Sequence, residues 1–195
     1  MVMNKATDAV IIGNPNSGRA GDEVYLQRFA KILSSGGLTA EVLNTQYPNH
    51  ATELASFAGD RLVVAAGGDG TVNEVLNGLS LEATLAVLPL GTANVLAREL
   101  GLPLDPVEAC RRILKGERSR VDFGVATNGA GAERRFACMA GIGFDAKVIG
   151  AVTPRLKRYL RRLAFQLTAF KVLFGNREGV KPLKVLNECI LMAGS

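Results

Sequence analysis

The sequence predicts an α/β fold with a parallel sheet, followed by an incomplete β-rich part. Two observations predict the sheet: short apolar runs rich in Val, Ile and Leu recur in the first half of the chain, and segments with helical spacing separate them. A third is that glycine-led turns follow three of these runs, where strands would pass into helices. Continuous apolar runs are typical of strands that helices cover on both faces.

Each element follows from these patterns in order. The expected strands are Ala9–Ile12, Ala40–Leu43, Leu62–Ala66 and Thr84–Leu88. The expected helices are Gly21–Ser35, Ala51–Ala58, Val72–Leu79, Ala93–Leu100 and Pro106–Lys115. Apolar residues gather on one face of the first helix, namely Val24, Leu26, Phe29, Ile32 and Leu33. Glycines are expected to end two helices, at Gly36-Gly37 and at Gly101.

After Gly116 the pattern changes to strand-like segments at 119–127, 134–148 and 181–193, with a hairpin-like loop between the first two. We therefore expect two domains, residues 1–117 and residues 118–195. One long helical segment, Arg155–Phe174, occupies a quarter of the second domain. The few remaining strands would leave a sheet edge unpaired, so we expect a fragment or a shortened protein.

Composition limits the classes of function. The 195 residues are 48% hydrophobic, and the 23 Lys and Arg against 18 Asp and Glu give a net charge of +5, which suits a phosphate or an anionic membrane face. With no Trp, three Tyr and no interleaving of aromatic and basic residues, nucleic-acid binding is not expected. His50 is the only histidine and lies in a polar loop, so neither a Ser-His-Asp triad nor a histidine-rich metal site is expected.

Cys110, Cys138 and Cys189 are widely spaced among apolar or helical residues, as reduced core thiols of a cytosolic protein are.

The N-terminus lacks the apolar run of a signal peptide, and no segment approaches the roughly 18 apolar residues of a membrane span. We expect a soluble cytoplasmic protein, with peripheral membrane contact left open. The sequence carries no signal for an oligomeric state.

The first glycine-led turn, Ile11–Gly21, is close to a Walker A loop. Gly13 and Gly18 have the required separation, but Arg19 and Ala20 replace the Lys and the Ser or Thr, which excludes the usual P-loop NTPase. A turn of Gly, Asn and Ser at a helix N-terminus still offers backbone N–H groups to a phosphate. A plain strand-to-helix turn is the alternative.

The second turn, Gly67–Thr71, has three glycines around an aspartate. We expect these glycines to adopt positive φ and to let a ligand approach the backbone. Thr71 and Glu74 fit a capping box for the helix that follows. Asn73 stands where the Rossmann fingerprint needs its third glycine. Because a carboxylate repels a phosphate unless a metal or sugar hydroxyl lies between them, Asp69 points to a nucleotide with its metal.

The third turn lies between Leu88 and Leu100, with Gly91, Thr92 as the expected N-cap and Asn94 as an expected loop brace. In a parallel sheet the carboxyl ends of the strands meet at one edge. The three turns should therefore converge on one crevice, which predicts a shared nucleotide site.

Four motifs, in this order and spacing, resemble the catalytic region of the diacylglycerol kinase family, which includes soluble bacterial lipid kinases and the sphingosine and ceramide kinases. They are NPNSG (14–18), GGDGTVNEVLNGL (67–79), LPLGTANVLARELGLP (88–103) and GIGFDAKV (141–148). The second and third are specific in combination. GGDGT alone also occurs in NAD kinases and is echoed in phosphofructokinases, so an NAD kinase-like enzyme stays an alternative.

The resemblance implies an ATP-dependent lipid kinase with an α/β domain of the NAD kinase and phosphofructokinase type, followed by a β-sandwich. It implies Mg²⁺, a lipid substrate such as diacylglycerol or a sphingoid-type lipid, and an Asp69 that orients the phosphates or the metal. The residues that it implies for ATP are Asn14, Pro15, Asn16, Ser17, Gly18, Thr45, Gly67, Gly68, Asp69, Gly70, Thr71, Val72, Asn73, Gly91 and Thr92. For Glu74 and Asn94, a cap and a brace are expected first and a ligand role second.

One departure from the family concerns catalysis. Similar full-length kinases continue beyond this length and supply an acidic general base and carboxylates for a structural Mg²⁺, whereas residues 181–195 contain no such acidic element. We expect the base beyond Ser195. A catalytically incomplete nucleotide-binding or regulatory module is therefore the alternative to a kinase.

The segment Arg155–Phe174 combines five basic residues in its first turns with an apolar face. A basic amphipathic helix can lie on an anionic bilayer, which would suit an enzyme with a lipid substrate. The alternative is that its apolar face packs on its own β domain.

Overall fold

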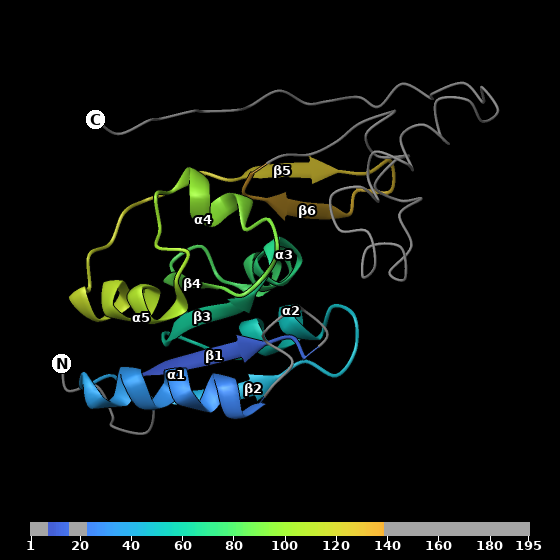
Figure 1. The fold of residues 1–195 in the computed structure, drawn as a ribbon. Helices are drawn as coiled ribbons and strands as arrows, with labels where there is room; N and C mark the ends of the chain where they lie inside the picture. The colour runs from blue at the N-terminus through green and yellow to red at the C-terminus, as the bar shows by residue number, and fades with distance from the viewer. Residues whose placement is uncertain (1–7, 16–22, 139–195) are drawn as a thin grey trace, which may run out of the picture. The chain divides into compact units, whose positions relative to one another are not determined.

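A computed structural model describes residues 8–15 and 23–138, which all lie in one compact unit of the chain. These residues form a parallel sheet covered by helices on both faces, together with an antiparallel hairpin (Figure 1). The predicted α/β class is therefore confirmed for this part of the chain.

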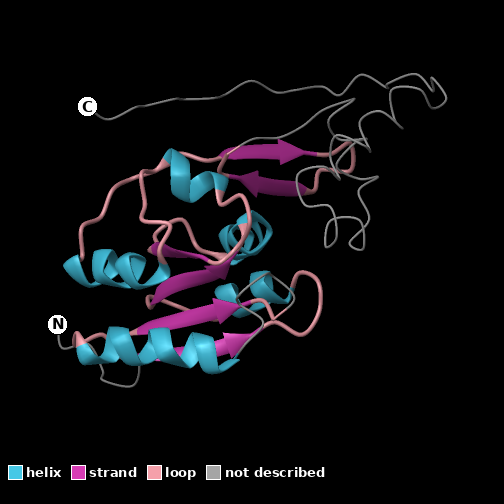
Figure 2. Cartoon of the chain, in the orientation of Figure 1, coloured by secondary structure: helices cyan, strands magenta, loops and turns pink. Residues whose placement is uncertain are grey.

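The elements alternate along the chain as the sequence predicts (Figure 2). The sheet strands are β1 (Ala9–Gly13), β2 (Ala40–Asn44), β3 (Leu62–Gly67) and β4 (Leu85–Pro89). The helices are α1 (Glu23–Ser35), α2 (His50–Ser56), α3 (Asp69–Gly78), α4 (Val95–Glu99) and α5 (Pro106–Lys115). The hairpin consists of β5 (Gly124–Thr127) and β6 (Glu133–Phe136).

The strand order is β2-β1-β3-β4, and all neighbours in this sheet are parallel. The register aligns the carboxyl ends: Gly13 pairs with Asn44 on one side and Ala66 on the other, while Gly67 pairs with Pro89. The turns that leave these strands therefore start side by side at one edge of the sheet.

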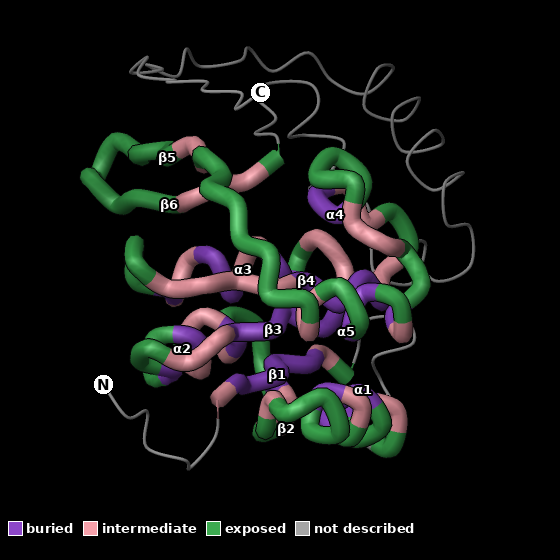
Figure 3. Tube along the Cα trace, turned by 90° about the vertical axis from the view of Figure 1, so that its left-hand side faces the viewer, coloured by how far each residue is buried: buried purple, intermediate pink, exposed green. Residues whose placement is uncertain are grey.

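Two apolar cores lie on the two faces of the sheet, because successive strand residues point to opposite sides. Val10 and Ile12 pack with residues of α2, α3 and α4, whereas Ile11 packs with residues of α1 and α5. Figure 3 shows the buried strands β1 and β3 between α2 and α3 on one side and α1 and α5 on the other. On the α1 side, Leu26 and Phe29 are fully buried as the predicted apolar face of that helix requires, whereas Val24 is 75% exposed, so its assignment to that face is wrong.

This arrangement creates a switch point between β1 and β3. The two strands are neighbours, yet the chain leaves β1 toward α1 on one face and leaves β3 toward α3 on the other. In open α/β sheets a crevice forms at the carboxyl ends of such a strand pair, and ligands bind there. The fold therefore positions the turns after β1 and β3 around the most favourable ligand position.

Helix ends follow the sequence signals in several places. Asp105 caps α5 by accepting from the N–H groups of Val107 and Glu108, both at 3.0 Å. Gly37 and Gly101 have positive φ values of 91° and 61° just after α1 and α4, so glycine ends these helices as expected.

Strand β5 lies within the predicted strand 119–127, and β6 begins one residue before the predicted strand 134–148. Asn128 closes its turn, because its Oδ1 accepts from the N–H groups of Ala130 and Ala132 at 3.0 and 2.9 Å. The predicted strand 181–193, the helical segment Arg155–Phe174 and the motif 141–148 lie outside the described residues. The division into domains 1–117 and 118–195 therefore stays a prediction.

The two described cysteines differ in burial. Cys110 is fully buried on α5, and burial raises the pKa of its thiol to about 11, with a further contribution from the Asp105 carboxylate. Cys138 is exposed just after the end of β6, so the expectation of a core thiol is wrong there. Cys189 lies outside the described residues.

Candidate functional site

The amino end of α3 forms the centre of the candidate site. Gly68 is the N-cap in an extended conformation, and no side chain caps this end of the helix. The carbonyl of Gly68 accepts from the N–H of Val72 at 3.1 Å, so the helix begins three residues earlier than predicted. The predicted capping box is wrong, because Thr71 and Glu74 both lie inside the helix. The uncapped N–H groups of the first turn and the helix dipole together favour an anion.

Thr71 has a buried hydroxyl without a partner. The residue is 4% exposed, and its Oγ1 makes no hydrogen bond. A Cβ on Gly67 would come within 2.7 Å of the Thr71 Cβ, so only glycine at position 67 makes room for this side chain. Among the described residues, the other buried side-chain polar atom without a partner is the Oδ1 of Asn44, at the end of β2. Unpaired buried polar atoms are rare, and one at an uncapped helix start marks a candidate binding position.

The turns after β3 and β4 touch through their glycines. A Cβ on Gly91 would overlap the Cα of Gly68, and a Cβ on Gly68 would lie 3.3 Å from the Cα of Gly91. Neither of these glycines, nor Gly67 or Gly70, has positive φ, so that prediction is wrong. The physical reason for glycine at 67, 68 and 91 is close packing, and only Gly70 faces open space.

Asp69 is not the bare carboxylate that the sequence indicates. Its Oδ1 accepts from the N–H of Leu96 at 3.3 Å, in the first turn of α4. The residue at the N-cap position of α4, Asn94, makes no side-chain cap bond to the N–H groups of this helix. Asp69 therefore connects the starts of α3 and α4, and its role toward a metal stays a prediction.

Asn94 braces the third turn as predicted. Its Oδ1 accepts from the N–H of Gly91, and its Nδ2 donates to the carbonyl of Gly91, both at 3.0 Å. Asn94 itself adopts the left-handed conformation, with φ 49°. The prediction that Thr92 is the N-cap is wrong, because Asn94 occupies that position and Thr92 is exposed in the turn.

A pocket of about 260 Å³ lies at the carboxyl ends of β1 and β2. Its lining residues are Asn14, Thr45, Gln46, Tyr47, Pro48 and Glu74. Thr45 is held at this edge because its N–H donates to the carbonyl of Gly13 at 2.8 Å. The pocket brings together Asn14 and Thr45, which the sequence assigned to the site, and adds Glu74 from α3.

Sequence reasoning missed Gln46, Tyr47 and Pro48 in this pocket. The available signal was the spacing of Tyr47 and His50, since an aromatic residue three positions before the only histidine can stack on it. The two rings do stack, with centroids 4.3 Å apart and an interplanar angle of 16°.

The other site residues lie as follows. Pro15 is exposed after β1, and Asn16, Ser17 and Gly18 lie outside the described residues. Val72 contributes its side chain to the core. Asn73 is half-buried on α3, and its carbonyl accepts from the Nδ2 of Asn77 at 2.8 Å.

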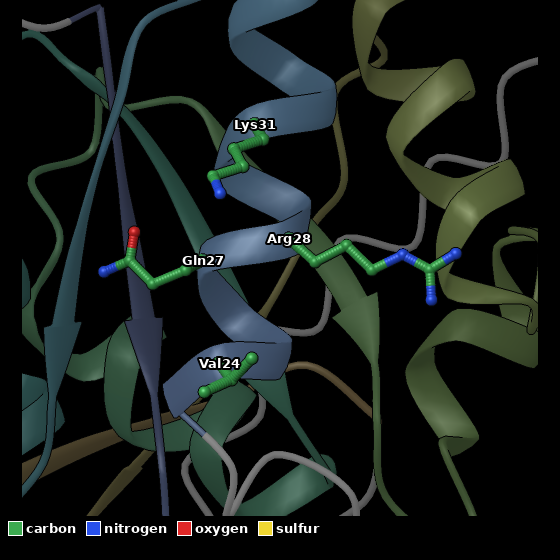
Figure 4. Close-up of a pocket in the computed structure, with 4 residues that line it drawn as sticks. All are labelled: Val24, Gln27, Arg28 and Lys31. Atoms are coloured by element: carbon green, nitrogen blue, oxygen red, sulfur yellow. The ribbon is translucent and has the colours of Figure 1, made fainter.

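A larger hollow of about 440 Å³ lies on the outer face of α1, lined by Val24, Gln27, Arg28 and Lys31. Figure 4 shows that the side chains of Gln27 and Arg28 point apart. All four residues come from one helix face, and none belongs to the motifs. This hollow therefore does not form the candidate site.

The part of the chain that the structure describes contains no group of three or more acidic, histidine or cysteine side chains placed to hold a metal ion. Across the same residues, no helix has both the length and the apolar character needed to cross a bilayer.

Comparison with known proteins points to one family. Residues 8–126 match the family described as the diacylglycerol kinase catalytic domain. The chain is 35% identical over 175 residues to the diacylglycerol kinase of Bacillus subtilis (strain 168), a match that covers 85% of this chain and 55% of that protein. It is 43% identical over 119 residues to the "Probable lipid kinase YegS-like" of Pseudomonas aeruginosa (strain UCBPP-PA14), covering 60% of this chain and 37% of that protein.

A crystal structure of a diacylglycerol kinase from Bacillus anthracis str. Sterne has a similar fold. The TM-score is 0.56 at 32% sequence identity, and the match covers 68% of this chain and 49% of that one. The chain thus spans about half the length of the relatives that it matches along most of its own length.

Proposed function

The chain belongs to the diacylglycerol kinase catalytic domain family, and from this premise we propose that its sheet edge binds ATP for the phosphorylation of a lipid hydroxyl. The γ-phosphoryl group would pass from ATP to the hydroxyl oxygen of a lipid such as diacylglycerol or a sphingoid-type lipid, leaving ADP and a phospholipid. The proton of the hydroxyl would go to a general base.

The observation that carries the proposal is the amino end of α3. It combines an uncapped helix start, the buried unpartnered hydroxyl of Thr71, and a second turn that packs against this helix start through Gly68 and Gly91. A triphosphate supplies the anionic oxygens that such N–H groups bind. The switch point between β1 and β3 supports the same position.

Asp69 is the residue that would hold Mg²⁺. Magnesium bound together with nucleotide phosphates commonly uses only one or two protein carboxylates, so a single aspartate fits. Its Oδ1 already accepts from Leu96 at 3.3 Å, which fixes the side chain beside the start of α3. When bound, the ion would neutralise phosphate charge. Asp69 would orient it, while Gly67 to Thr71 would hold the phosphates.

A second candidate is a nucleotide-binding or regulatory module without catalysis. An NAD kinase-like enzyme would bind a dinucleotide in preference to ATP. Lipid contact at an anionic membrane and a cytoplasmic location belong to the first candidate and are proposed with it.

The test uses the purified 195-residue chain with radiolabelled ATP, Mg²⁺ and mixed micelles of either diacylglycerol or sphingosine. Formation of the labelled phospholipid supports the kinase and excludes the inactive module. ATP binding by calorimetry without lipid phosphorylation supports the module. Binding of NAD but not ATP supports the NAD kinase-like enzyme, and binding of none of these ligands would contradict every form of the proposal.

A further inference from the structure

The loop that follows β2 forms one wall of the pocket at the sheet edge. Residues 45 to 48 all line this pocket, together with Asn14 and Glu74. The wall therefore consists of a continuous run of the chain, and it contains the only aromatic residue among the lining side chains, Tyr47.

Tyr47 is held in place by several contacts. Its ring stacks on His50 with centroids 4.3 Å apart, and its hydroxyl donates to the Oε2 of Glu53 at 2.6 Å. The N–H of Gln46 donates to the Nδ1 of His50 at 3.1 Å, and the N–H of His50 donates to the carbonyl of Tyr47 at 3.2 Å. The Glu53 carboxylate that accepts this bond also raises the pKa of the Tyr47 hydroxyl above 10.0, so the phenol stays neutral around pH 7.

The ring is fixed but not covered. Tyr47 is 49% exposed although one ring face stacks on His50, so much of its remaining surface is open. An aromatic side chain that is already ordered loses little conformational entropy when a flat group stacks on it. The structure thus presents a preorganised planar surface at the pocket.

The distance from Tyr47 to the start of α3 suits the length of a nucleotide. Thr45 follows the end of β2, and β1 separates β2 from β3, so the loop and the start of α3 are about 10 Å apart across the sheet. Glu74, which lines the pocket, lies on α3 itself and connects the two places. A nucleoside triphosphate with its phosphates at the start of α3 can therefore extend its base to Tyr47.

We propose that Tyr47 is a nucleotide-binding residue whose ring stacks on the base of the nucleoside triphosphate. Its neighbours Asn14, Thr45 and Gln46 supply polar groups for the sugar and the edge of the base. This inference rests on the proposed function, because it needs the triphosphate at α3. It commits to a nucleobase, while an apolar lipid chain in the same pocket is an outcome that the test distinguishes.

The experiment measures by calorimetry the affinities of the full 195-residue chain for ATP and for inorganic tripolyphosphate, which has no base. Tyr47→Ala should weaken ATP binding roughly ten-fold or more, as the removal of a base-stacking aromatic residue does, and should leave tripolyphosphate binding unchanged. Tyr47→Phe keeps the ring and loses only the bond to Glu53, so it should retain most of the ATP affinity. Phe57→Ala is the matched control, because Phe57 is an 80% exposed aromatic residue outside the pocket lining.

The outcomes separate the two proposals. If the unaltered chain binds neither ATP nor tripolyphosphate, the proposed function fails. If it binds both and Tyr47→Ala changes neither affinity, the stacking role of Tyr47 alone is overturned. Equal weakening of both ligands would also overturn it, because a general loss of structure explains that result. Weaker binding of diacylglycerol micelles with unchanged ATP affinity would assign the pocket to a lipid instead.

Discussion

The side-chain amide of Asn77 on α3 pairs with the backbone of Arg135 on β6 as a neighbouring strand would. Its Oδ1 accepts from the Arg135 N–H at 2.8 Å, and its Nδ2 donates to the Arg135 carbonyl at 2.9 Å. The Arg135 guanidinium returns to the helix and donates to the carbonyls of Leu79 and Leu76 at 2.6 and 3.4 Å. A cation placed at the carboxyl end of a helix interacts favourably with its dipole.

Asn77→Ala should destabilise the protein by about 1–3 kcal/mol, because both partner groups on Arg135 lose their bonds in a half-buried place. Urea unfolding followed by circular dichroism measures this loss. Hydrogen exchange gives a local readout, since the amide of Arg135 should exchange faster while the amides of β1 keep their protection. Gln27→Ala on the exposed face of α1 serves as the control and should change stability by less than about 0.5 kcal/mol. A variant as stable as the parent would show that the pair contributes nothing.

Gly91→Ala and Gly70→Ala should differ sharply in stability, although both replace a glycine of the motifs. A Cβ at position 91 overlaps the Cα of Gly68, which forces the two turns apart and should cost roughly 1–3 kcal/mol or more. A Cβ at position 70 meets nothing within 4 Å, and its φ is not positive, so alanine in the helix should be neutral or stabilise by up to about 1 kcal/mol. Thermal unfolding of the two variants checks the order, and a Gly70→Ala variant less stable than Gly91→Ala would refute the packing argument.

Thr71→Val should separate folding from binding. The hydroxyl of Thr71 is buried without a partner, so an isosteric methyl should leave stability unchanged or raise it slightly. If this hydroxyl turns to a phosphate when the nucleotide binds, the same variant should weaken ATP binding several-fold, while Thr71→Ser restores it. Calorimetric titration of both variants decides the point: unchanged affinity in Thr71→Val would confine Thr71 to packing.

Asp69 offers a test of its two roles. Asp69→Asn keeps an oxygen that can accept from Leu96, so the fold should hold, whereas Asp69→Ala loses this bond and should cost about 1 kcal/mol, as the loss of a helix cap does. If the carboxylate also orients Mg²⁺, Asp69→Asn should reduce ATP affinity in the presence of Mg²⁺ and not in EDTA. If Asp69→Asn and the parent bind ATP equally well in Mg²⁺, Asp69 caps α4 and does not orient the metal.

The buried thiol of Cys110 should make the stability of the fold depend on pH. Its pKa rises from 9.0 to about 11 in the folded state, so the unfolded chain loses this proton first as the pH rises. The contribution to stability is therefore full below pH 9 and is lost between about pH 9 and pH 11. Because tyrosines and lysines titrate in the same range, the measurement compares the parent with Cys110→Ala. The difference in their free energies of unfolding should shrink as pH rises from 8 to 11, and a constant difference would contradict the assignment.

The sequence predicted the α/β class and the elements of the sheet well, because Val-rich runs buried on both faces and amphipathic helices leave strong local patterns. It located the glycine-led turns after β3 and β4 but not the reason for their glycines. Positive φ is a local property, whereas the contact between Gly68 and Gly91 depends on the spacing of β3 and β4. The cap on α4 escaped prediction for the same reason, since Asp69 lies 27 positions from Leu96.

The pocket illustrates what local patterns leave out. Thr45 was assigned through family resemblance, and Tyr47 was missed because its role depends on lining the same pocket as Asn14, which follows another strand. Asn77 likewise reads in the sequence as one more polar residue of an amphipathic helix. Its partner lies 58 residues further along the chain, where no periodicity connects the two.

The bond between α3 and the hairpin bears on where this protein can be divided. A chain that ends after Gly116 would lack Arg135, which contacts the carboxyl end of α3. Asn77 and the carbonyls of Leu76 and Leu79 would then lose these hydrogen bonds and become exposed to water. The other end of this ten-residue rod, about 15 Å away, is where the glycines meet. Hybrid chains that exchange the portion beyond the hairpin should therefore be joined after Cys138, so that the contacts between α3 and the hairpin stay intact.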